Sequence, residues 1–278
     1  QCGTNCLKNI KMTKLIYLVN PKDEFLEHAG DRIPIGLLML SAYLKQHNHQ
    51  TKIIDLNHDE LLTTYLDETP DFICFTVPTP NYKQVIDYVK RLKPFFKSTK
   101  FIAGGNHVSA YPTEPLTLEN FDYIVAGHGD GEQALLDIVE GRVKEQIVQA
   151  PFIENLDILP LPDYEGLDLS RYNLQIENEK AMGIIFSRGC LYNCSFCGSA
   201  TIKRWRSHSP EYFVNHIKYL IENYNITTFY IMDDIFTRDK EEIHKICDLI
   251  INNNLKIKFR CTTRSDLLDE NLIKHLSE

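Results

Sequence analysis

The stretch SRGCLYNCSFCGSA contains three cysteines within eight positions, Cys190, Cys194 and Cys197. Thiolates are ligands for zinc and for iron–sulfur clusters, whereas three structural thiols would rarely lie so close together. A structural zinc site needs four ligands, and the fourth would have to be His208 or Cys261. A four-iron cluster fits the count better, because three thiolates leave one iron open for a substrate or cofactor. The spacing therefore favours an iron–sulfur cluster over zinc or inert thiols, provided that the three side chains converge.

Strand-like and helix-like runs alternate around this loop. The apolar run before it predicts a strand, and Ser209 followed by Pro210 predicts the start of a helix. Asp269 opens a last helical pattern, inside which the sequence stops. Units of this kind place active sites at the carboxyl ends of their strands. We expect strands over 183–187, 227–232 and 256–263, and a helix over 239–253.

The pattern C-x-x-x-C-x-x-C, directly after the first strand of a β/α series, resembles the radical S-adenosylmethionine (SAM) superfamily. The resemblance implies a [4Fe–4S] cluster on the three cysteines, with SAM bound to the open iron. An external donor such as flavodoxin or ferredoxin would supply one electron, which cleaves the sulfonium bond and yields a 5′-deoxyadenosyl radical. Phe196 and Gly198, on either side of Cys197, are then expected to contact SAM. Only the N-terminal half of the superfamily's barrel is visible, over 182–278.

Two stretches downstream resemble the cobalamin-binding branch of this superfamily. RWRSHSPE (204–211) resembles its W-R-x-R-S-P pattern, and the alternative is a solvated basic loop. IMDDIFTRD (231–239) resembles its F-x-D-D-x-F pattern, which implies that Asp233 and Asp234 bind the ammonium group of SAM. Asp234 could instead cap the turn. Arg264 follows the third strand and could pair with the SAM carboxylate or form an ordinary salt bridge.

The first half of the chain predicts a doubly wound α/β domain over 12–145. Its strand-like runs are apolar nearly throughout, as in a parallel sheet that is buried on both faces. The fold class is therefore a flavodoxin- or Rossmann-like doubly wound parallel sheet, followed by a partial (β/α) radical SAM barrel. We expect strands over 14–19, 51–56, 71–76, 100–105 and 121–127, and helices over 34–46, 58–67, 81–96 and 131–140.

Residues 12–140 also resemble the cobalamin-binding domain of the same branch, on stretches such as FTVPTPNY, IAGGNHVSAYP and FDYIVAGHGDGEQAL. Glycine lets the backbone approach a large flat cofactor, although tight turns also require it. The D-x-H-x-x-G motif that supplies a cobalt ligand is missing, so cobalamin would bind without a His ligand, and His28, His107 and His128 are expected to be loop residues. We expect cofactor contacts from four glycines and two polar side chains: Gly104, Gly105, Gly127, Gly129, Thr76 and Asn81.

The composition argues against several classes of protein. The 278 residues are 43% hydrophobic and 24% charged, as in globular proteins. The formal charge of -8 argues against nucleic acid as the main partner, and no apolar run is long enough to cross a membrane. With no export signal, we expect a cytoplasmic protein whose eight cysteines are reduced or bind metal. Residues 1–11, with Cys2 and Cys6, are expected to be a disordered leader, and the proline-punctuated stretch 146–181 a linker.

These features lead to one main hypothesis and two alternatives. The main hypothesis is a cobalamin-dependent radical SAM enzyme, in this branch most often a methyltransferase. A tRNA methylthiotransferase also places an α/β domain before a radical domain, but that type needs a second cysteine triad, and the first domain offers only Cys74. The other alternative is a truncated chain that binds cofactor without turnover, because the sequence stops at Glu278 within the barrel. On that hypothesis the chain alone is inactive. The sequence does not indicate the substrate.

Overall fold

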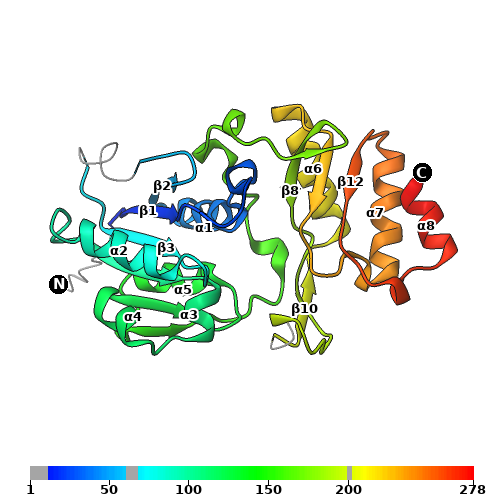
Figure 1. Cartoon of the computed structure of the whole chain (residues 1–278). Coiled ribbons are helices and arrows are strands. Elements are labelled where there is room, and N and C mark those ends of the chain that lie inside the picture. Colours follow the sequence, from blue (N-terminus) through cyan, green and yellow to red (C-terminus); the bar gives the residue numbers. More distant parts are fainter. Residues whose placement is uncertain (1–11, 61–67, 199–201) are drawn as a thin grey trace, which may run out of the picture. The chain divides into compact units, whose positions relative to one another are not determined.

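The computed structural model describes residues 12–60, 68–198 and 202–278. The expected leader, with Cys2 and Cys6, lies outside the described residues. The chain divides into two compact units (Figure 1). Unit 1 comprises the residues up to Lys22 together with Leu40–Pro151, and unit 2 comprises Asp23–Met39 together with Phe152–Glu278.

Unit 1 contains a six-stranded sheet in the order β2-β1-β3-β4-β5-β6, and all neighbouring strands in it are parallel. Leu18 of β1, the second strand in this order, pairs with Ile53 of β2 on one side and Cys74 of β3 on the other. This order confirms the predicted doubly wound sheet. The strands are β1 (Leu15–Asn20), β2 (Gln50–Asp55), β3 (Phe72–Thr76), β4 (Lys100–Gly104), β5 (Tyr123–Ala126) and β6 (Ile147–Gln149).

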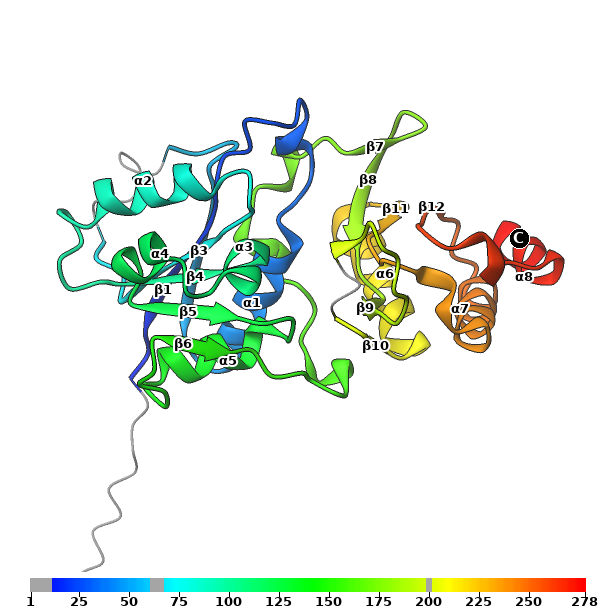
Figure 2. The ribbon, with the colours of Figure 1, turned by 60° about the horizontal axis from the view of Figure 1, so that its bottom comes forward.

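Helices cover both faces of this sheet (Figure 2). α2 packs on one face because its apolar residues recur every three or four positions, and Val85, Val89 and Leu92 are buried in the core as predicted. On the other face, the Tyr43 hydroxyl of α1 donates to the Gln133 side chain of α5 at 2.9 Å. The helices are α1 (Ile35–Gln46), α2 (Tyr82–Leu92), α3 (Asn106–Ala110), α4 (Pro115–Asn120) and α5 (Gly131–Val139).

Unit 2 contains a second sheet in the order β12-β11-β8-β7, in which only β7 and β8 are antiparallel. Its three parallel strands alternate with α6, α7 and α8, which confirms the predicted partial (β/α) barrel. The strands are β7 (Gln175–Ile176), β8 (Glu179–Ile184), β11 (Thr228–Ile231) and β12 (Lys258–Arg260). The helices are α6 (Pro210–Tyr224), α7 (Lys240–Asn252) and α8 (Glu270–Ser277).

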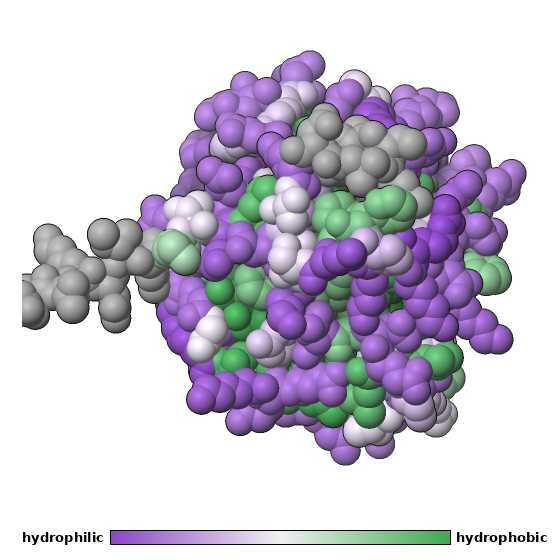
Figure 3. Space-filling view, turned by 90° about the vertical axis from the view of Figure 1, so that its left-hand side faces the viewer, coloured by the Kyte–Doolittle hydropathy of each residue, from purple (hydrophilic) through white to green (hydrophobic). Residues whose placement is uncertain are grey.

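The starts of the three helices of unit 2 are fixed by their capping residues. Ser209 accepts a hydrogen bond from Tyr212 N, and Asp269 accepts one from Leu272 N, so both predicted helix starts are confirmed. Asp239 caps α7 in the same way. The face drawn in Figure 3 is mostly hydrophilic, with smaller hydrophobic areas between the polar side chains. No helix in the described part of the chain is both long enough and apolar enough to span a bilayer.

Four stretches differ from the expectation. RWRSHSPE begins as a strand, β10 (Arg204–Ser207), which pairs antiparallel with β9 (Ser187–Cys190). The expected strand over 183–187 is therefore divided between β8 and β9. The expected linker holds β6, short 3-10 helices and the β7–β8 pair, because segments of two or three residues join a sheet by pairing and are too short to show a period. Residues 58–60 are not helical, and the rest of the helix expected there lies outside the described residues.

Candidate functional site

The three cysteines of the motif lie at the carboxyl end of β8, on β9 and the loop after it. Cys190 is buried, Cys194 is half-buried and Cys197 is exposed. Cys197 N donates to Cys194 O at 3.1 Å, which folds the last two cysteines into one turn. Gly189 has a positive φ of 88°, and a Cβ there would lie 2.1 Å from Arg204 O, so only glycine lets β10 approach β9 this closely.

The predicted convergence of the three thiols is not confirmed by the geometry. In the part of the chain that the structure describes, no group of three His, Cys, Asp or Glu side chains could hold a metal ion. Cys197 is exposed whereas Cys194 is half-buried, so the last two thiols of the motif differ in their surroundings. The donor set itself, three thiols on one loop beside a cationic side chain, fits a cluster with one open iron.

Neither proposed fourth ligand for zinc joins these cysteines. His208 is buried, its Nδ1 lies 3.1 Å from an Asp157 carboxylate oxygen, and its ring stacks on Tyr212. Burial lowers the pKa of His208 to about 4. Burial raises the pKa of the half-buried Cys261 thiol, which disfavours the thiolate that a metal would bind. The structure therefore gives no support to a four-ligand zinc site.

Asp233 and Asp234, which the sequence assigned one shared role, differ in their surroundings. Asp233 is buried at the end of β11, and its carboxylate oxygens accept hydrogen bonds from Phe186 N and Ser187 N, each at 2.8 Å. The Ser187 hydroxyl donates a third, at 2.5 Å. Burial, with a smaller contribution from the neighbouring Asp234, raises the pKa of Asp233 to about 6. Asp233 therefore joins β11 to the backbone that leads into β9, whereas Asp234 is exposed.

The structure brings Arg264 to the cysteine loop. Its guanidinium carbon lies 4.1 Å from the ring centroid of Tyr192, and its Nη1 lies 3.8 Å from Cys194 Sγ. The salt-bridge alternative for this residue is present, because Nη2 lies 2.9 Å from Asp266 Oδ2. Phe196 is 91% exposed. Tyr192 and Asp266 had no signal in the sequence, because their contacts with Arg264 form only when the loop after β12 meets the cysteine loop.

The expected cofactor contacts of unit 1 lie at the carboxyl ends of β3, β4 and β5, but several of them have partners within the protein. The side chain of Asn81 is buried and donates to Lys22 O at 2.7 Å. Gly105 has a φ of 99°, and a Cβ there would lie 3.0 Å from the hydroxyl of Thr76. A Cβ at Gly129 would lie 2.0 Å from the carbonyl oxygen of the residue that follows β6.

Gly127 and Gly104 complete this edge. Gly127 has a φ of 89°, and a Cβ there would lie 2.9 Å from a Gln149 side-chain oxygen. At Gly104 the nearest neighbour of a Cβ would be Val125 Cβ at 4.0 Å. The backbone conformation and close packing of the protein thus account for Gly105, Gly127 and Gly129 without a cofactor, whereas Gly104 has more space.

His107 is not the loop residue that the sequence predicted. It lies buried in α3, where its ring stacks on Tyr82 at a centroid distance of 4.1 Å. Its Nε2 lies 2.8 Å from a Glu114 carboxylate oxygen, while its buried Nδ1 has no hydrogen-bond partner among the described residues. His107 and Glu114 also line an open hollow with about 790 Å³ of empty space, part of which is open solvent. The sequence signal for His107 was its place shortly after the glycine pair. His28 and His128 are exposed, as loop residues usually are.

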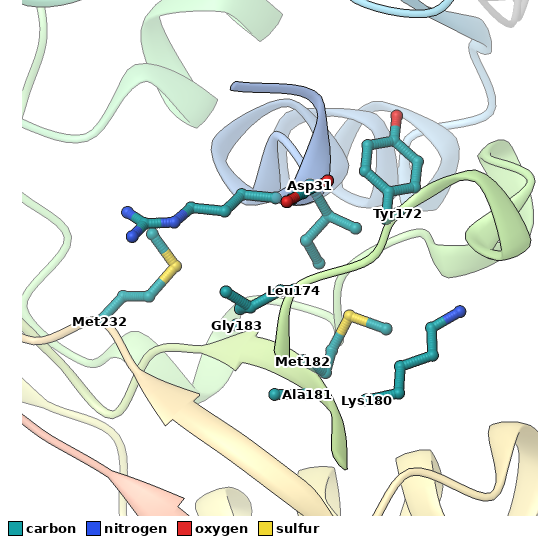
Figure 4. A pocket seen from close by; sticks show the side chains of 10 residues that line it. Asp31, Tyr172, Leu174, Lys180, Ala181, Met182, Gly183 and Met232 are labelled. Carbon is teal, nitrogen blue, oxygen red and sulfur yellow. The ribbon is translucent and has the colours of Figure 1, made fainter. Parts of the chain in front are cut away.

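A small pocket lies in unit 2 among segments that are distant in sequence (Figure 4). It has about 310 Å³ of empty space, part of which is open solvent. Met232 packs over Gly183, where a Cβ would lie 2.7 Å from the methionine sulfur. Asp31 and Lys180 add charged groups to the lining. None of the residues that the sequence assigned to a site lines this pocket.

Two family models match the chain, a B12 binding domain over residues 25–137 and the Radical SAM superfamily over residues 184–278. The chain is 26% identical to an uncharacterized methyltransferase of Pyrococcus horikoshii over 97% of its own length and 64% of that protein's. It is 26% identical to an anaerobic magnesium-protoporphyrin IX monomethyl ester cyclase of Synechocystis, over 90% of this chain and 56% of that protein. It thus spans roughly half to two-thirds of the length of these relatives.

Solved structures share this fold. The cobalamin-dependent S-adenosylmethionine radical enzyme OxsB, with aqua-cobalamin and S-adenosylmethionine bound, superposes with a TM-score of 0.77 at 20% identity. The superposition covers 95% of this chain and 42% of that enzyme. Together the two family models span most of the chain, in the order that the sequence predicted. The chain therefore belongs to the radical SAM proteins that carry a B12-binding domain.

Proposed function

We propose that this chain is a radical SAM enzyme that cleaves SAM reductively at a [4Fe–4S] cluster and transfers a methyl group with the help of cobalamin. The observation that carries the proposal is a motif of three cysteines at the carboxyl end of the first parallel strand of unit 2, within the residues that match the Radical SAM model. The methyltransferase assignment is supported by the names of several relatives.

In this proposal the ligands of the cluster are Cys190, Cys194 and Cys197. When bound, the cluster supplies the electron that cleaves the sulfonium bond of SAM. Exposed Asp234 would receive the ammonium group of SAM, because the oxygens of Asp233 are already occupied by protein donors. Among the residues that the structure describes, a Cβ at Gly198 would meet no atom within 4 Å, which is consistent with space for a ligand beside the loop.

Cobalamin is proposed to bind at the carboxyl edge of the sheet in unit 1. Gly104 leaves space there, and the buried Nδ1 of His107 offers a hydrogen-bonding atom that no described protein group uses. The motif for a His ligand to cobalt is missing, so we expect no coordination from the protein. We also keep a cytoplasmic location as part of the proposal, because the proposed cluster ligands must be reduced thiols.

Anaerobic reconstitution of the chain with iron and sulfide tests the proposal. We expect iron and sulfide uptake, a cluster absorption band and, with a reductant and SAM, release of 5′-deoxyadenosine. A chain that takes up no cluster contradicts the proposal. Cluster uptake without SAM cleavage supports instead the alternative of a protein that binds its cofactors without turnover.

A cobalamin titration, followed by visible spectroscopy under the same conditions, tests the second cofactor. If cobalamin binds and its spectrum shows no His-ligated form, the proposal is supported. If cobalamin does not bind, the cobalamin part of the proposal is wrong. The methylthiotransferase alternative needs a second cysteine triad, and the cysteine that the described part of unit 1 offers is buried Cys74.

A further inference from the structure

Arg264 makes three kinds of contact, all within unit 2. Its Nε and Nη2 donate to the two carboxylate oxygens of Asp266, at 3.0 and 2.9 Å. Its planar group lies over the ring of Tyr192, two residues after the first cysteine of the motif. Its Nη1 points at the sulfur of Cys194, at 3.8 Å. The residue thus connects the loop after β12 to the cysteine loop.

These contacts fix the guanidinium in two directions. A two-pronged pair with a carboxylate sets the orientation of the guanidinium plane, because both N–H groups must meet both oxygens. Stacking on Tyr192 then sets the distance of the plane from the loop. The remaining donor, Nη1, is therefore held in place beside Cys194 before any ligand arrives.

A fixed cation beside a proposed cluster ligand favours the more negative of two redox states of a bound cluster. The side chain of Arg264 is 37% exposed, so solvent screens part of this effect. A guanidinium keeps its charge at every working pH, so the effect does not depend on its own titration.

We infer that Arg264 is a positioning residue that anchors the turn carrying Cys194 to the loop after β12 and would raise the reduction potential of a bound cluster. The inference rests on the proposed function, since it needs a cluster on the three cysteines. It differs from the role that the sequence suggested, because the donors of Arg264 are directed at Asp266 and Cys194 rather than left free for the carboxylate of SAM.

The test compares variants of the reconstituted chain in the absence of SAM, by iron content and by a redox titration followed by electron paramagnetic resonance. Arg264→Gln removes the positive charge. Arg264→Lys keeps the charge but removes the two-pronged pairing of the guanidinium with Asp266. Asp266→Asn keeps the arginine but weakens its anchor, so it also covers the possibility that an Arg264 variant misfolds. Arg260→Gln is the matched control, because Arg260 is an exposed arginine on β12.

We expect Arg264→Gln to lower both the iron content and the midpoint potential, with about two- to fivefold less reduced cluster at a fixed potential. Arg264→Lys should lower the iron content but keep a potential close to that of the wild type, and Asp266→Asn should give a smaller loss of iron. Arg260→Gln should match the wild type in both measurements.

The outcomes separate this inference from the proposed function. If the wild type binds a cluster and Arg264→Gln matches Arg260→Gln in iron content and potential, the inference is wrong and the proposed function stands. If the wild type takes up no cluster, both are wrong. Circular dichroism of each variant checks that the loss of iron does not come from unfolding.

Discussion

The carboxyl ends of parallel strands form an edge in each unit, and the two edges are built differently. In unit 1, the backbone after β6 fills the space beside Gly129, and the side chain of Asn81 donates a hydrogen bond to a backbone carbonyl of the protein. In unit 2, a Cβ at Gly198 would meet no atom of the described residues within 4 Å, and Phe196 is 91% exposed. Glycine-rich loops that look alike in sequence therefore serve close packing at one edge and leave open space at the other.

The largest effect is expected from removing a thiol of the open edge. Cys197→Ala should abolish cluster uptake, because the proposed cluster has only three protein ligands. Cys74→Ala is the control from unit 1, where burial within β3 raises the pKa of the thiol. Iron and sulfide are measured per chain after anaerobic reconstitution. Full iron content in Cys197→Ala would show that Cys197 is not a cluster ligand. Loss of iron in Cys74→Ala would contradict the placement of the cluster in unit 2 alone.

Added methyl groups test the packing difference directly. Gly129→Ala should lower the free energy of unfolding by about 1–3 kcal/mol, because its Cβ would overlap the carbonyl of Ala150. Gly198→Ala should change it by less than about 0.5 kcal/mol. Urea unfolding of both variants gives the comparison. Equal effects of the two substitutions would show that the edges are packed alike.

Asp233 should make the stability of unit 2 depend on pH. Burial raises its pKa from 3.8 to about 6, so the folded state binds the proton more tightly than the unfolded chain does. Its contribution to stability is fully present below pH 3.8 and is lost as the pH rises through about 6. Asp233→Asn should remove this dependence and leave one backbone N–H unpaired, at a cost of about 1–3 kcal/mol.

Exposed Asp234 gives the matched control for that prediction. Asp234→Asn should keep the pH dependence of the wild type, measured as the free energy of unfolding in urea from pH 4 to pH 7. It should instead weaken SAM binding to the reconstituted chain, as the proposed function requires. If Asp234→Asn flattens the pH dependence as much as Asp233→Asn does, the two carboxylates are not separated as described.

The smallest effect is expected at the edge of unit 1. His107→Ala should weaken cobalamin binding about fivefold, because it removes a buried hydrogen-bonding atom that has no partner among the described residues. His128→Ala, which changes an exposed histidine at the same edge, should leave the affinity unchanged. Both are measured by visible titration, with urea unfolding as the check for stability. Equal affinities in the two variants would remove His107 from the proposed site.

Local signals in the sequence predicted most of the fold. The apolar period of α2 and the caps at Ser209 and Asp269 depend on residues within one or two turns, so they could be found without a tertiary structure. β6 and β10 were missed, because strands of three or four residues gain their stability from pairing with a partner that is distant in sequence. The cysteine motif was found because its spacing lies within one loop.

The sequence by itself determined the order of the two domains, the parallel sheets and the three proposed cluster ligands, because these depend on local period and spacing. Only the tertiary structure decided which polar groups already form hydrogen bonds within the protein. Asp233 and Asn81 are occupied by protein donors and acceptors, and Arg264 lies against a cysteine 70 positions earlier in the chain. The physical reason is that a side chain's partners, its burial and its remaining hydrogen-bonding capacity are set by segments that folding brings together from distant parts of the sequence.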